Sequence, residues 1–480
     1  MKKRYSLYVG VLVVLGLLAV LVACAVNPVT GKKQLMLISE KSEISLGQNT
    51  DREIRQQYGI YEDQALNGYL NAVGQRMVPH THRPNLQYHF TVLDTPVINA
   101  FAAPGGYIYI TRGILALMNS EAELAVVVGH ELGHVSARHS VAKMSGMILV
   151  NLGLAIGSAL SEDIAKISGV AGIGMQLLFL KFSRDDEYQA DSLGVLYARE
   201  AKYAPGEMLK FFSSLERLTD DGGKHRLPNF LSTHPLTPKR IVKAQELLKP
   251  EDARLAVRRE DYMARINGVV YGDNPRQGFV EGHAFYQPDL AFTFLLPSDW
   301  AIENTPKQVL LMAKDGKAAM VLQAESSPMD VDEYAKKQAS QLGEAQFLNR
   351  KSMSINGFQS IDAFYQVPQK EKEALKIQLT CIRKEGMIYT FSSISTASAF
   401  DGYSGEFNRT ARSFRKLSDP QHLSPRPSRL QLVKASGRDT LRAILTSSAV
   451  DRKLWDRLAV YNYAKLDSVP AAGSTVKIIR

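Results

Sequence analysis

The sequence predicts an α+β fold of several domains, in which a mainly helical first part with a small sheet precedes an α+β sandwich and a small tail. Its 480 residues are too many for a single compact core. Apolar residues make up 45% and charged residues 22% of the chain, which is typical of globular proteins and excludes a disordered chain or one with many membrane spans. Residues 250–278 and 419–429 have the composition of boundaries. We therefore expect domains over residues 24–262, 279–417 and 430–480.

The first 23 residues have the layout of a secretion signal, with three basic residues at positions 2–4 followed by an apolar run from residue 7 to residue 23. The run ends in Leu21-Val22-Ala23-Cys24, which resembles the lipobox of bacterial lipoproteins. The resemblance implies cleavage before Cys24, acylation of that cysteine and attachment to a membrane. Ala25 is not the aspartate that would resemble an inner-membrane retention signal, which favours a periplasmic protein anchored in the inner leaflet of the outer membrane. An uncleaved membrane anchor is the alternative, because the run is just long enough to span a bilayer.

The net charge of +10 is unevenly distributed along the chain. Residues 418–480 contain 11 Lys or Arg against 5 Asp or Glu. Such a tail suits contact with an anionic surface such as lipid headgroups, and a solvated basic face without a partner is the equal alternative. We expect no nucleic-acid partner. The only cysteine besides Cys24 is Cys381, which lies in an alternating strand-like run and is expected to be a buried apolar residue.

Helices are expected to dominate the first part of the chain. Ser120 is a good helix N-cap, and Glu123 three residues later completes a capping box, so a helix is expected to start there and to continue through the apolar run that follows. Two apolar stretches over residues 147–160 and 170–180 are each too short to cross a bilayer comfortably, and we expect a buried helical hairpin. The other expected elements are a helical region over residues 40–77, strands over residues 88–93 and 107–111, and a helix over residues 240–248.

Strands are expected to dominate the middle part, which we predict to be the α+β sandwich. No role is predicted for this domain. The expected strands cover residues 292–296, 309–313, 318–324 and 387–393, and the expected helices cover residues 331–342 and 403–414.

The sharpest chemical signal is the motif His130-Glu131-Leu132-Gly133-His134. Residues i and i+4 share one face of a helix, so both imidazoles can reach one zinc ion at about 2.0–2.1 Å. Glu131 projects beside the metal, where a base for the bound water is needed. The motif also follows shortly after a strong helix start, which is the context that it requires. We therefore expect one zinc ion per chain, and a pair of surface histidines is the alternative.

Two ligands do not make a stable zinc site, so a third is required. The metzincin pattern would place a glycine and a histidine where this sequence has Ala137 and Ser140, so that class is excluded. His139 comes one position too early to complete it. Farther along the chain, Glu187 and Asp191 are again i and i+4, which offers one carboxylate for zinc and another for a hydrogen bond to a ligand histidine.

Three segments resemble gluzincin metallopeptidases of the HtpX, BepA and CAAX prenyl protease type. They are the HELGH motif, residues 183–194 (SRDDEYQADSLG) and residues 232–235 (STHP). Residues 99–106 (NAFAAPGG) resemble that family's segment before its edge strand, and residues 24–31 (CAVNPVTG) resemble its periplasmic lipoprotein branch. The similarity covers residues 27–248. It implies His130, His134 and Glu187 as zinc ligands, Glu131 as the base and Asp191 as the partner of a ligand histidine.

His234 lies in the STHP segment and has three alternative roles. In similar periplasmic members this histidine approaches the metal and is thought to hold the enzyme inactive. As a donor to the oxyanion it would instead promote the reaction, and as a capped loop residue it would have no chemical role. Arg240 is a candidate for stabilising the oxyanion, and an arginine on a helix surface is equally compatible with the pattern.

The tail resembles the two ends of a LysM module, which binds the glycan chains of peptidoglycan. The resemblance implies a strand–helix–helix–strand fold for the tail. The resemblance rests on residues 437–444, Asn462 and residues 472–479. The sequence departs from the pattern by inserting Arg438 between the glycine and the aspartate. We therefore prefer a packing or docking module without a ligand over a module that binds peptidoglycan.

Together these features predict a zinc-dependent endopeptidase of the bacterial cell envelope. Zinc would polarise the scissile carbonyl while Glu131 takes a proton from the bound water. Residues 107–111 are the candidate edge strand for pairing with an extended substrate. The resemblance implies unfolded or misassembled envelope proteins as substrates. A zinc amidase acting on peptidoglycan and a non-catalytic assembly chaperone that retains zinc are the alternatives.

Overall fold

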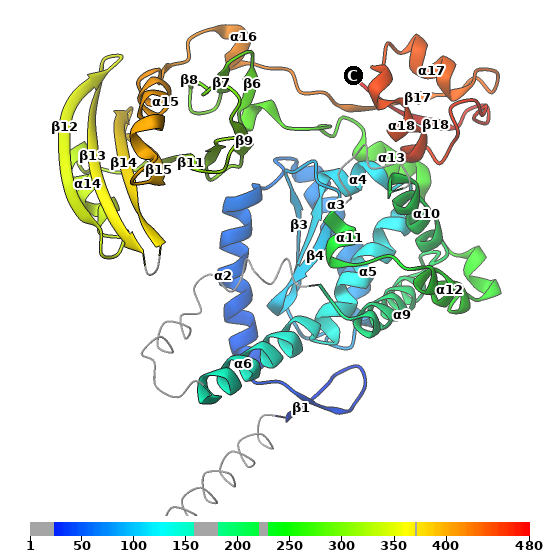
Figure 1. The fold of residues 1–480 in the computed structure, drawn as a ribbon. Coiled ribbons are helices and arrows are strands. Elements are labelled where there is room, and N and C mark those ends of the chain that lie inside the picture. The colour runs from blue at the N-terminus through cyan, green and yellow to red at the C-terminus, as the bar shows by residue number, and fades with distance from the viewer. Residues whose placement is uncertain (1–23, 158–180, 220–228, 370–371) are drawn as a thin grey trace, which may run out of the picture. The chain divides into compact units, whose positions relative to one another are not determined.

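The computed structural model describes residues 24–157, 181–219, 229–369 and 372–480. The chain forms two compact units (Figure 1). Unit 1 comprises Met1–Arg55, Gly59–Gly272 and Ser428–Arg480, and unit 2 comprises Gln56–Tyr58 and Asp273–Pro427. The predicted secretion signal and the predicted apolar helix over residues 170–180 lie outside the described residues. Within the described ranges, no helix combines the length and the apolar character that crossing a membrane requires.

Helices dominate unit 1, as predicted for the first part of the chain. The predicted helical region over residues 40–77 is two helices, because Gly59 at a φ of 70° ends the first and the Asp63 side chain caps the second. In the described part of the chain, the α-helices that precede residue 273 are α2 (Glu40–Tyr58), α3 (Gln64–Met77), α4 (Arg112–Leu117), α5 (Glu121–Ser136), α6 (His139–Gly157), α9 (Arg184–Glu200), α10 (Glu207–Thr219), α11 (Asn229–Thr233), α12 (Pro238–Glu246) and α13 (Arg259–Ile266).

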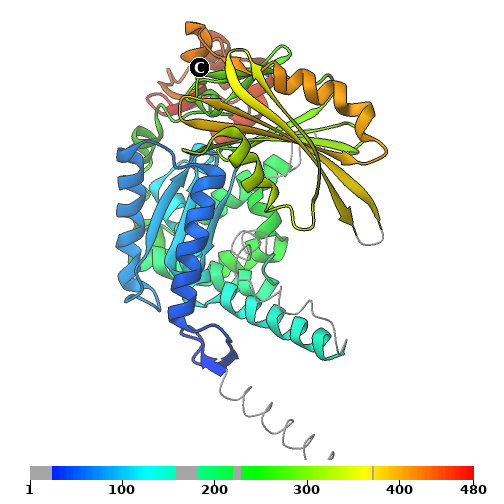
Figure 2. The same ribbon diagram turned by 90° about the vertical axis from the view of Figure 1, so that its left-hand side faces the viewer.

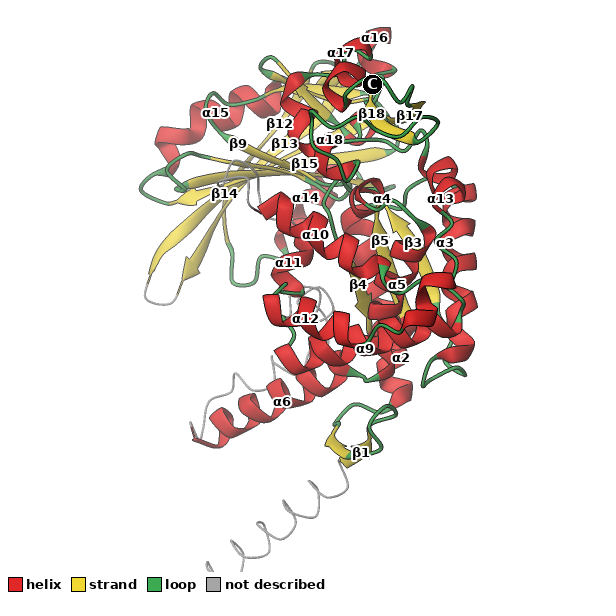
Figure 3. Ribbon diagram, turned by 90° about the vertical axis from the view of Figure 1, so that its right-hand side faces the viewer, coloured by secondary structure: helices red, strands yellow, loops and turns green. Residues whose placement is uncertain are grey.

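A three-stranded sheet lies among these helices (Figure 3). Its strands are β3 (His89–Leu93), β4 (Ala100–Ala103) and β5 (Tyr107–Thr111), in the order β3-β5-β4. β5 pairs in parallel with β3 and antiparallel with β4. The prediction that residues 107–111 form an edge strand is therefore wrong. Gly105 and Gly106, both at positive φ, turn the chain from β4 directly into its neighbour β5, and β3 then pairs with the other side of β5, so β4 is at the edge.

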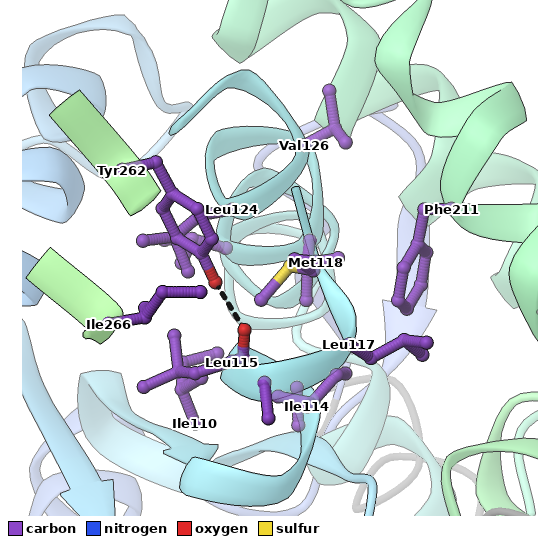
Figure 4. Packing of buried hydrophobic residues seen from close by; sticks show 14 of the residues in the cluster. Ile110, Ile114, Leu115, Leu117, Met118, Leu124, Val126, Phe211, Tyr262 and Ile266 are labelled. Atoms are coloured by element: carbon purple, nitrogen blue, oxygen red, sulfur yellow. Dashed lines mark hydrogen bonds between the residues drawn. The ribbon is translucent and has the colours of Figure 1, made fainter. Parts of the chain in front are cut away.

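Helix α5 runs through the hydrophobic core of unit 1. Ser120 caps it by accepting a hydrogen bond from the Glu123 backbone N–H, as predicted, and all of its residues are buried. Figure 4 shows the packing at its start, where Tyr262 donates a hydrogen bond of 2.7 Å to the carbonyl oxygen of Leu115 among surrounding aliphatic side chains. A helix buried on all sides is held in position along its whole length, which suits a helix that carries chemical groups.

Residues 428–480, here called the C-terminal segment, belong to unit 1 and not to a third unit, which differs from the predicted division of the chain. The segment contains β17 (Leu430–Lys434), α17 (Leu441–Ser447), α18 (Trp455–Tyr461) and β18 (Thr475–Ile479), and its two strands pair antiparallel. The strand–helix–helix–strand order is the predicted one. Its apolar side chains share the hydrophobic core of the rest of unit 1. The resemblance to a LysM module stays a prediction.

Lys477 connects the C-terminal segment to α4 through hydrogen bonds. Its side chain is fully buried, and its ammonium group donates to the carbonyl oxygens of Ala116, Leu117 and Met118 at 2.5–3.3 Å. Burial lowers the pKa of Lys477 well below its usual range. A buried ammonium group costs several kcal/mol unless its donors are satisfied, on the order of the penalty for burying any ion. Here the carbonyl groups at the end of a helix satisfy them.

Unit 2 is built on a seven-stranded antiparallel sheet, which agrees with the predicted strand-rich sandwich. Its order is β12-β13-β14-β15-β11-β10-β9, and a four-stranded sheet has the order β16-β8-β7-β6. Helices α14 (Val331–Ala339) and α15 (Phe400–Arg412) pack on opposite faces of the larger sheet (Figure 2). Cys381 is fully buried in this unit, as predicted. The strands are β6 (Phe279–Glu281), β7 (Ala284–Gln287), β8 (Phe292–Leu295), β9 (Ala301–Asn304), β10 (Val309–Met312), β11 (Ala318–Ser326), β12 (Gln346–Ile355), β13 (Phe358–Gln369), β14 (Lys372–Lys384), β15 (Met387–Thr396) and β16 (Arg415–Lys416).

Candidate metal centre

Four buried side chains converge at one point in unit 1. His130 and His134 come from α5, Glu187 comes from the first turn of α9, and His234 directly follows α11. Each offers one ligand atom, and these four atoms all lie within 4.8 Å of one another. The first three are the residues predicted as zinc ligands, and the fourth is the residue for which the sequence leaves three roles open.

Local sequence brings the two helices into contact with the right faces toward each other. A capping box between Ser183 and Asp186 starts α9, so that Glu187 lies in its first turn. The two helices approach closely because glycines stand where they meet. A Cβ on Gly194 would lie 2.9 Å from the backbone nitrogen of His130, and one on Gly133 would lie 3.1 Å from the Cα of Ala190. The glycines therefore allow Glu187 to reach the histidines of α5.

The distances between the ligand atoms suit one tetrahedral ion. Two nitrogen atoms that each bind zinc at about 2.0–2.1 Å are about 3.3–3.4 Å apart in a tetrahedron. His130 Nε2 lies 3.1 Å from His134 Nε2 and 3.2 Å from His234 Nδ1. Glu187 Oε1 lies 2.9 Å from His234 Nδ1 and 3.6 Å from His134 Nε2. Three imidazoles and a carboxylate are a donor set that zinc prefers.

Hydrogen bonds on the far side of each α5 histidine leave the inner nitrogen free to bind a cation. His130 Nδ1 donates to Asp191 Oδ1 at 2.9 Å, so its Nε2 carries a lone pair. His139 Nε2 donates to Gln189 Oε1 at 2.8 Å, which makes His139 Nδ1 an acceptor for His134 Nδ1 at 2.9 Å. His134 Nε2 is then also unprotonated. Burial lowers the pKa of His134 well below its usual range, which keeps this ring neutral.

His139 is a functional residue that the sequence does not reveal. Its spacing is wrong for a metal ligand, and no other role follows from its place in the chain. Arg138, at a φ of 56°, ends the run of α5 and turns the chain so that the His139 ring reaches back to His134. A contact between positions i and i+5 across a helix end has no sequence pattern of its own.

Arg240 and Asp191 form a buried pair behind the ligands. The Arg240 guanidinium donates to both Asp191 oxygens at 2.7 and 2.8 Å, and its Nη1 lies 2.7 Å from Glu187 Oε2. Although burial alone would raise it, the hydrogen bonds from Arg240 and His130 lower the pKa of Asp191 to about 2. Arg240 is 2% exposed, so the alternative of an arginine on a helix surface is wrong. Its position at the first turn of α12, which packs on α9, buries it.

Glu131 is buried beside the four ligand atoms, whereas Asp191 and Glu187 are in contact with the Arg240 guanidinium. Glu131 Oε1 has no hydrogen-bond partner among the described residues, and His234 Nε2 lies 3.6 Å from it. Burial raises the pKa of Glu131 to about 7, although the nearby His130 opposes this shift. An unsatisfied buried oxygen is rare in native proteins and marks a group with another task.

Comparison with known proteins places this site in a family. Residues 64–248, which include every side chain of the site, match the family model of peptidase family M48. The chain contains an M48 peptidase domain. M48 metallopeptidases depend on zinc, which agrees with the donor set of His130, His134, Glu187 and His234.

Two curated relatives of the M48 domain are informative. The chain is 27% identical over 299 residues to the "Beta-barrel assembly-enhancing protease" of Escherichia coli K12, which is 60% of this chain and 57% of that relative. It is 27% identical over 252 residues to the "Mitochondrial metalloendopeptidase OMA1" of Schizosaccharomyces pombe, which is 51% of this chain and 73% of that relative. The chain thus spans little more than half the length of the bacterial relative.

Among solved structures, cyanobacterial PsbP from Synechocystis matches with a TM-score of 0.25 and 16% identity, over 29% of this chain and 96% of that chain.

Proposed function

We propose that this chain is a zinc-dependent endopeptidase of the bacterial cell envelope that degrades or processes unfolded or misassembled proteins. The observation that carries the proposal is the buried group of His130, His134 and Glu187 with Glu131 beside it, inside an M48 domain. His130, His134 and Glu187 would hold the zinc ion, which would supply the Lewis acidity that polarises the scissile carbonyl and acidifies water.

Glu131 is the proposed base of the reaction. Its unpartnered Oε1 is available to accept a proton from water as the oxygen–carbon bond forms. The same carboxyl group then returns that proton to the leaving amine nitrogen as the carbon–nitrogen bond breaks. Glu131 is 1% exposed, and this burial keeps bulk water from competing for the oxygen.

Arg240 and Asp191 are proposed as positioning residues. Asp191 fixes the ring of His130, and Arg240 contacts both Asp191 and Glu187. Because the guanidinium group is engaged by these two carboxylates and by the Pro235 carbonyl oxygen, we prefer this role over stabilisation of the oxyanion.

We propose that His234 is a latch that occupies the fourth ligand position. The 2.9–3.2 Å distances of its Nδ1 from Glu187 Oε1 and His130 Nε2 support this role, because a fourth protein ligand closes a zinc site to hydrolysis. His234→Ala should then raise the basal cleavage rate of an unfolded substrate, whereas the exposed His283→Ala should not change it. A donor to the oxyanion would instead cost on the order of 10²–10³ in rate, so a large drop would overturn the latch.

The edge strand β4 is the proposed pairing partner for substrate. Ala102 of this strand donates a backbone hydrogen bond to Glu131, so the strand borders the base. Extended peptides pair with sheet edges through main-chain hydrogen bonds. A peptide substrate with N-methyl groups on the residues flanking the cleaved bond should therefore be cleaved more slowly than its unmethylated parent. Equal rates would contradict strand pairing.

The envelope location rests on the lipobox-like leader and on the bacterial relative, whose name describes a protease that enhances β-barrel assembly. We propose that Cys24 carries the acyl anchor and that the protein faces the periplasm from the outer membrane. Mass spectrometry of the mature amino terminus tests this, and a chain that begins at Met1 without acyl groups would contradict it.

The decisive test of the function uses the purified chain in three assays. We expect cleavage of denatured casein, loss of cleavage with a chelator and recovery with zinc. Release of muropeptides without casein cleavage would instead indicate a peptidoglycan amidase. If the chain suppresses aggregation of an unfolded protein without hydrolysing it, and Glu131→Gln suppresses aggregation equally well, the chain would be a chaperone.

A further inference from the structure

A second site of chemical interest lies in unit 1, where the C-terminal segment meets the M48 domain. A cavity of about 160 Å³ opens there, lined by Val97 and Ile98 before β4, by α4, and by Arg457 and Tyr461 of α18. A single ordered water needs only about 10–15 Å³ of such space, so the cavity has room for a larger group. Most of its accessible wall is apolar.

Arg112, which lines this cavity, has a guanidinium nitrogen without a hydrogen-bond partner among the described residues. Arg112 is 1% exposed, its Nε donates to Asp94 at 2.6 Å, and its Nη1 donates to the Val270 carbonyl oxygen at 3.0 Å. Its Nη2 is buried without any hydrogen bond in the described part of the chain. Leaving such a donor unsatisfied costs roughly 1–3 kcal/mol, which a bound acceptor would remove.

The charged residues that line the cavity indicate which kind of hydrogen-bond acceptor it would bind. Among the described residues that line the cavity are two arginines, Arg112 and Arg457, and no aspartate or glutamate. The Nη1 atom of Arg457 donates a hydrogen bond of 3.4 Å to the Tyr271 hydroxyl. Asp94 already pairs with Arg112, so the Arg457 side chain supplies the further positive charge beside the apolar walls. This combination suits an anion that also carries an apolar group, and arginine is the residue that best binds carboxylates.

The surroundings indicate where this carboxylate comes from. Ile98 lies two residues before the edge strand β4, and its carbonyl oxygen accepts a hydrogen bond of 3.1 Å from Phe230. A polypeptide paired antiparallel with β4 would run its carboxyl end toward Ile98. The cavity is thus placed to receive the end of a chain that passes the proposed base.

We propose that this cavity binds the carboxyl terminus of a polypeptide whose last residue is apolar. Arg112 Nη2 donates to one carboxylate oxygen, Arg457 supplies the second cationic contact, and the last side chain lies against Val97 and Val270. This proposal deepens the proposed peptidase function, on which it rests, because it names a feature of the substrate. A free fatty or aromatic acid has the same chemistry and is distinguished by the test.

The test measures binding by calorimetry to the full chain carrying Glu131→Gln, so that no peptide is cleaved. The probes are acetyl-trialanyl-leucine as the acid, the same peptide as the amide, and hexanoate. We expect the amide to bind roughly 10–100-fold more weakly than the acid, because it loses a charge-assisted hydrogen bond. Hexanoate should bind more weakly than the peptide acid.

Variants of the lining complete the experiment. Arg457→Gln should weaken binding of the acid but not of the amide, whereas the exposed Arg438→Gln on the same segment should change neither. Val97→Phe should fill the cavity and abolish binding while Arg112 and its pair with Asp94 stay intact. Equal affinity for acid and amide, no binding of either, or hexanoate binding as tightly as the peptide would overturn the proposal. Casein cleavage by the chain with Glu131 intact is scored separately, so failure here leaves the proposed function standing.

Discussion

Two glutamates on the same helix, Glu121 and Glu131, are both buried and yet have opposite surroundings. Glu121, in the first turn of α5, accepts hydrogen bonds from Tyr69, Tyr203, Arg76 and Arg258 at 2.7–3.0 Å. These partners outweigh burial and lower the pKa of Glu121. Glu131, three turns later, has an oxygen without a partner among the described residues and a raised pKa. The fold satisfies one carboxylate and leaves the other free to react.

The comparison shows that one helix carries both a glutamate that stabilises the fold, Glu121, and a glutamate proposed to react, Glu131. A satisfied carboxylate contributes to stability and has little left to offer a substrate. An unsatisfied one costs stability, and such strain is retained in native proteins at functional sites. We therefore expect substitutions at the two positions to divide cleanly between stability and activity.

The largest effect is expected at Glu131. Glu131→Gln should lower turnover about 10²–10⁴-fold, because the amide cannot accept the proton. Zinc content and melting temperature should stay near the values of the unsubstituted chain, since no hydrogen bond of the Oε1 oxygen is lost. The measurements are casein cleavage, metal analysis and thermal unfolding on one preparation. Near-normal turnover with full zinc would remove Glu131 from the reaction.

Asp191 sharpens the comparison because it is satisfied and still belongs to the site. Asp191→Asn should weaken zinc binding about 10–100-fold, the usual effect of losing a partner of a ligand histidine. Glu187→Gln should weaken zinc binding more, because it removes a ligand. Competition with a chelating dye measures both. If Asp191→Asn abolishes zinc binding and Glu187→Gln does not, Asp191 would be the zinc ligand and Glu187 would not.

Glu121→Gln should destabilise the protein by about 1–2 kcal/mol, because an amide replaces a charged acceptor of four donors and two of these donors are half-exposed arginines that water can satisfy. The zinc content and the turnover of the folded protein should not change. Urea unfolding gives the stability, and the exposed Glu216→Gln is the control. A loss of turnover without a loss of stability would break the comparison.

The smallest effect concerns pH. The folded state lowers the pKa of Glu121 below the ordinary value of 4.5, so its contribution to stability is present above that value and is lost as the pH falls through the folded pKa. The stability difference between the unsubstituted chain and Glu121→Gln should therefore be constant from pH 7 to pH 5 and shrink at lower pH. Urea midpoints of both chains across this range measure it, and a difference that grows on acidification would contradict the assignment.

The sequence predicts what depends on spacing along one helix and misses what depends on the packing of distant elements. The ligand pair of α5 and the pair Glu187 and Asp191 of α9 follow from i and i+4 spacing, so the sequence alone reveals both. The order of three strands is a tertiary property, so no local pattern shows that residues 100–103 form the edge strand β4 and that β5 lies between its neighbours. The contact of His139 with His134 escapes local patterns for the same reason.

The C-terminal segment shows the same limit at longer range. Its strand–helix–helix–strand order is the one that the resemblance to a LysM module implies. Its attachment to α4 through Lys477 joins residues some 360 positions apart, and no local pattern signals such a contact. The segment was therefore expected to be a separate domain.

The order of the chain has a consequence for biosynthesis. Unit 2 interrupts unit 1, so the ribosome delivers residues 273–427 before the segment that holds Lys477 and Tyr463. At about 5–20 residues per second, residues 273–480 need about 10–40 s to emerge. Throughout that interval the start of α5 lacks the Tyr463 contact to Glu123, and the end of α4 lacks its lysine. We expect the nascent peptidase domain to stay incomplete until translation reaches β18.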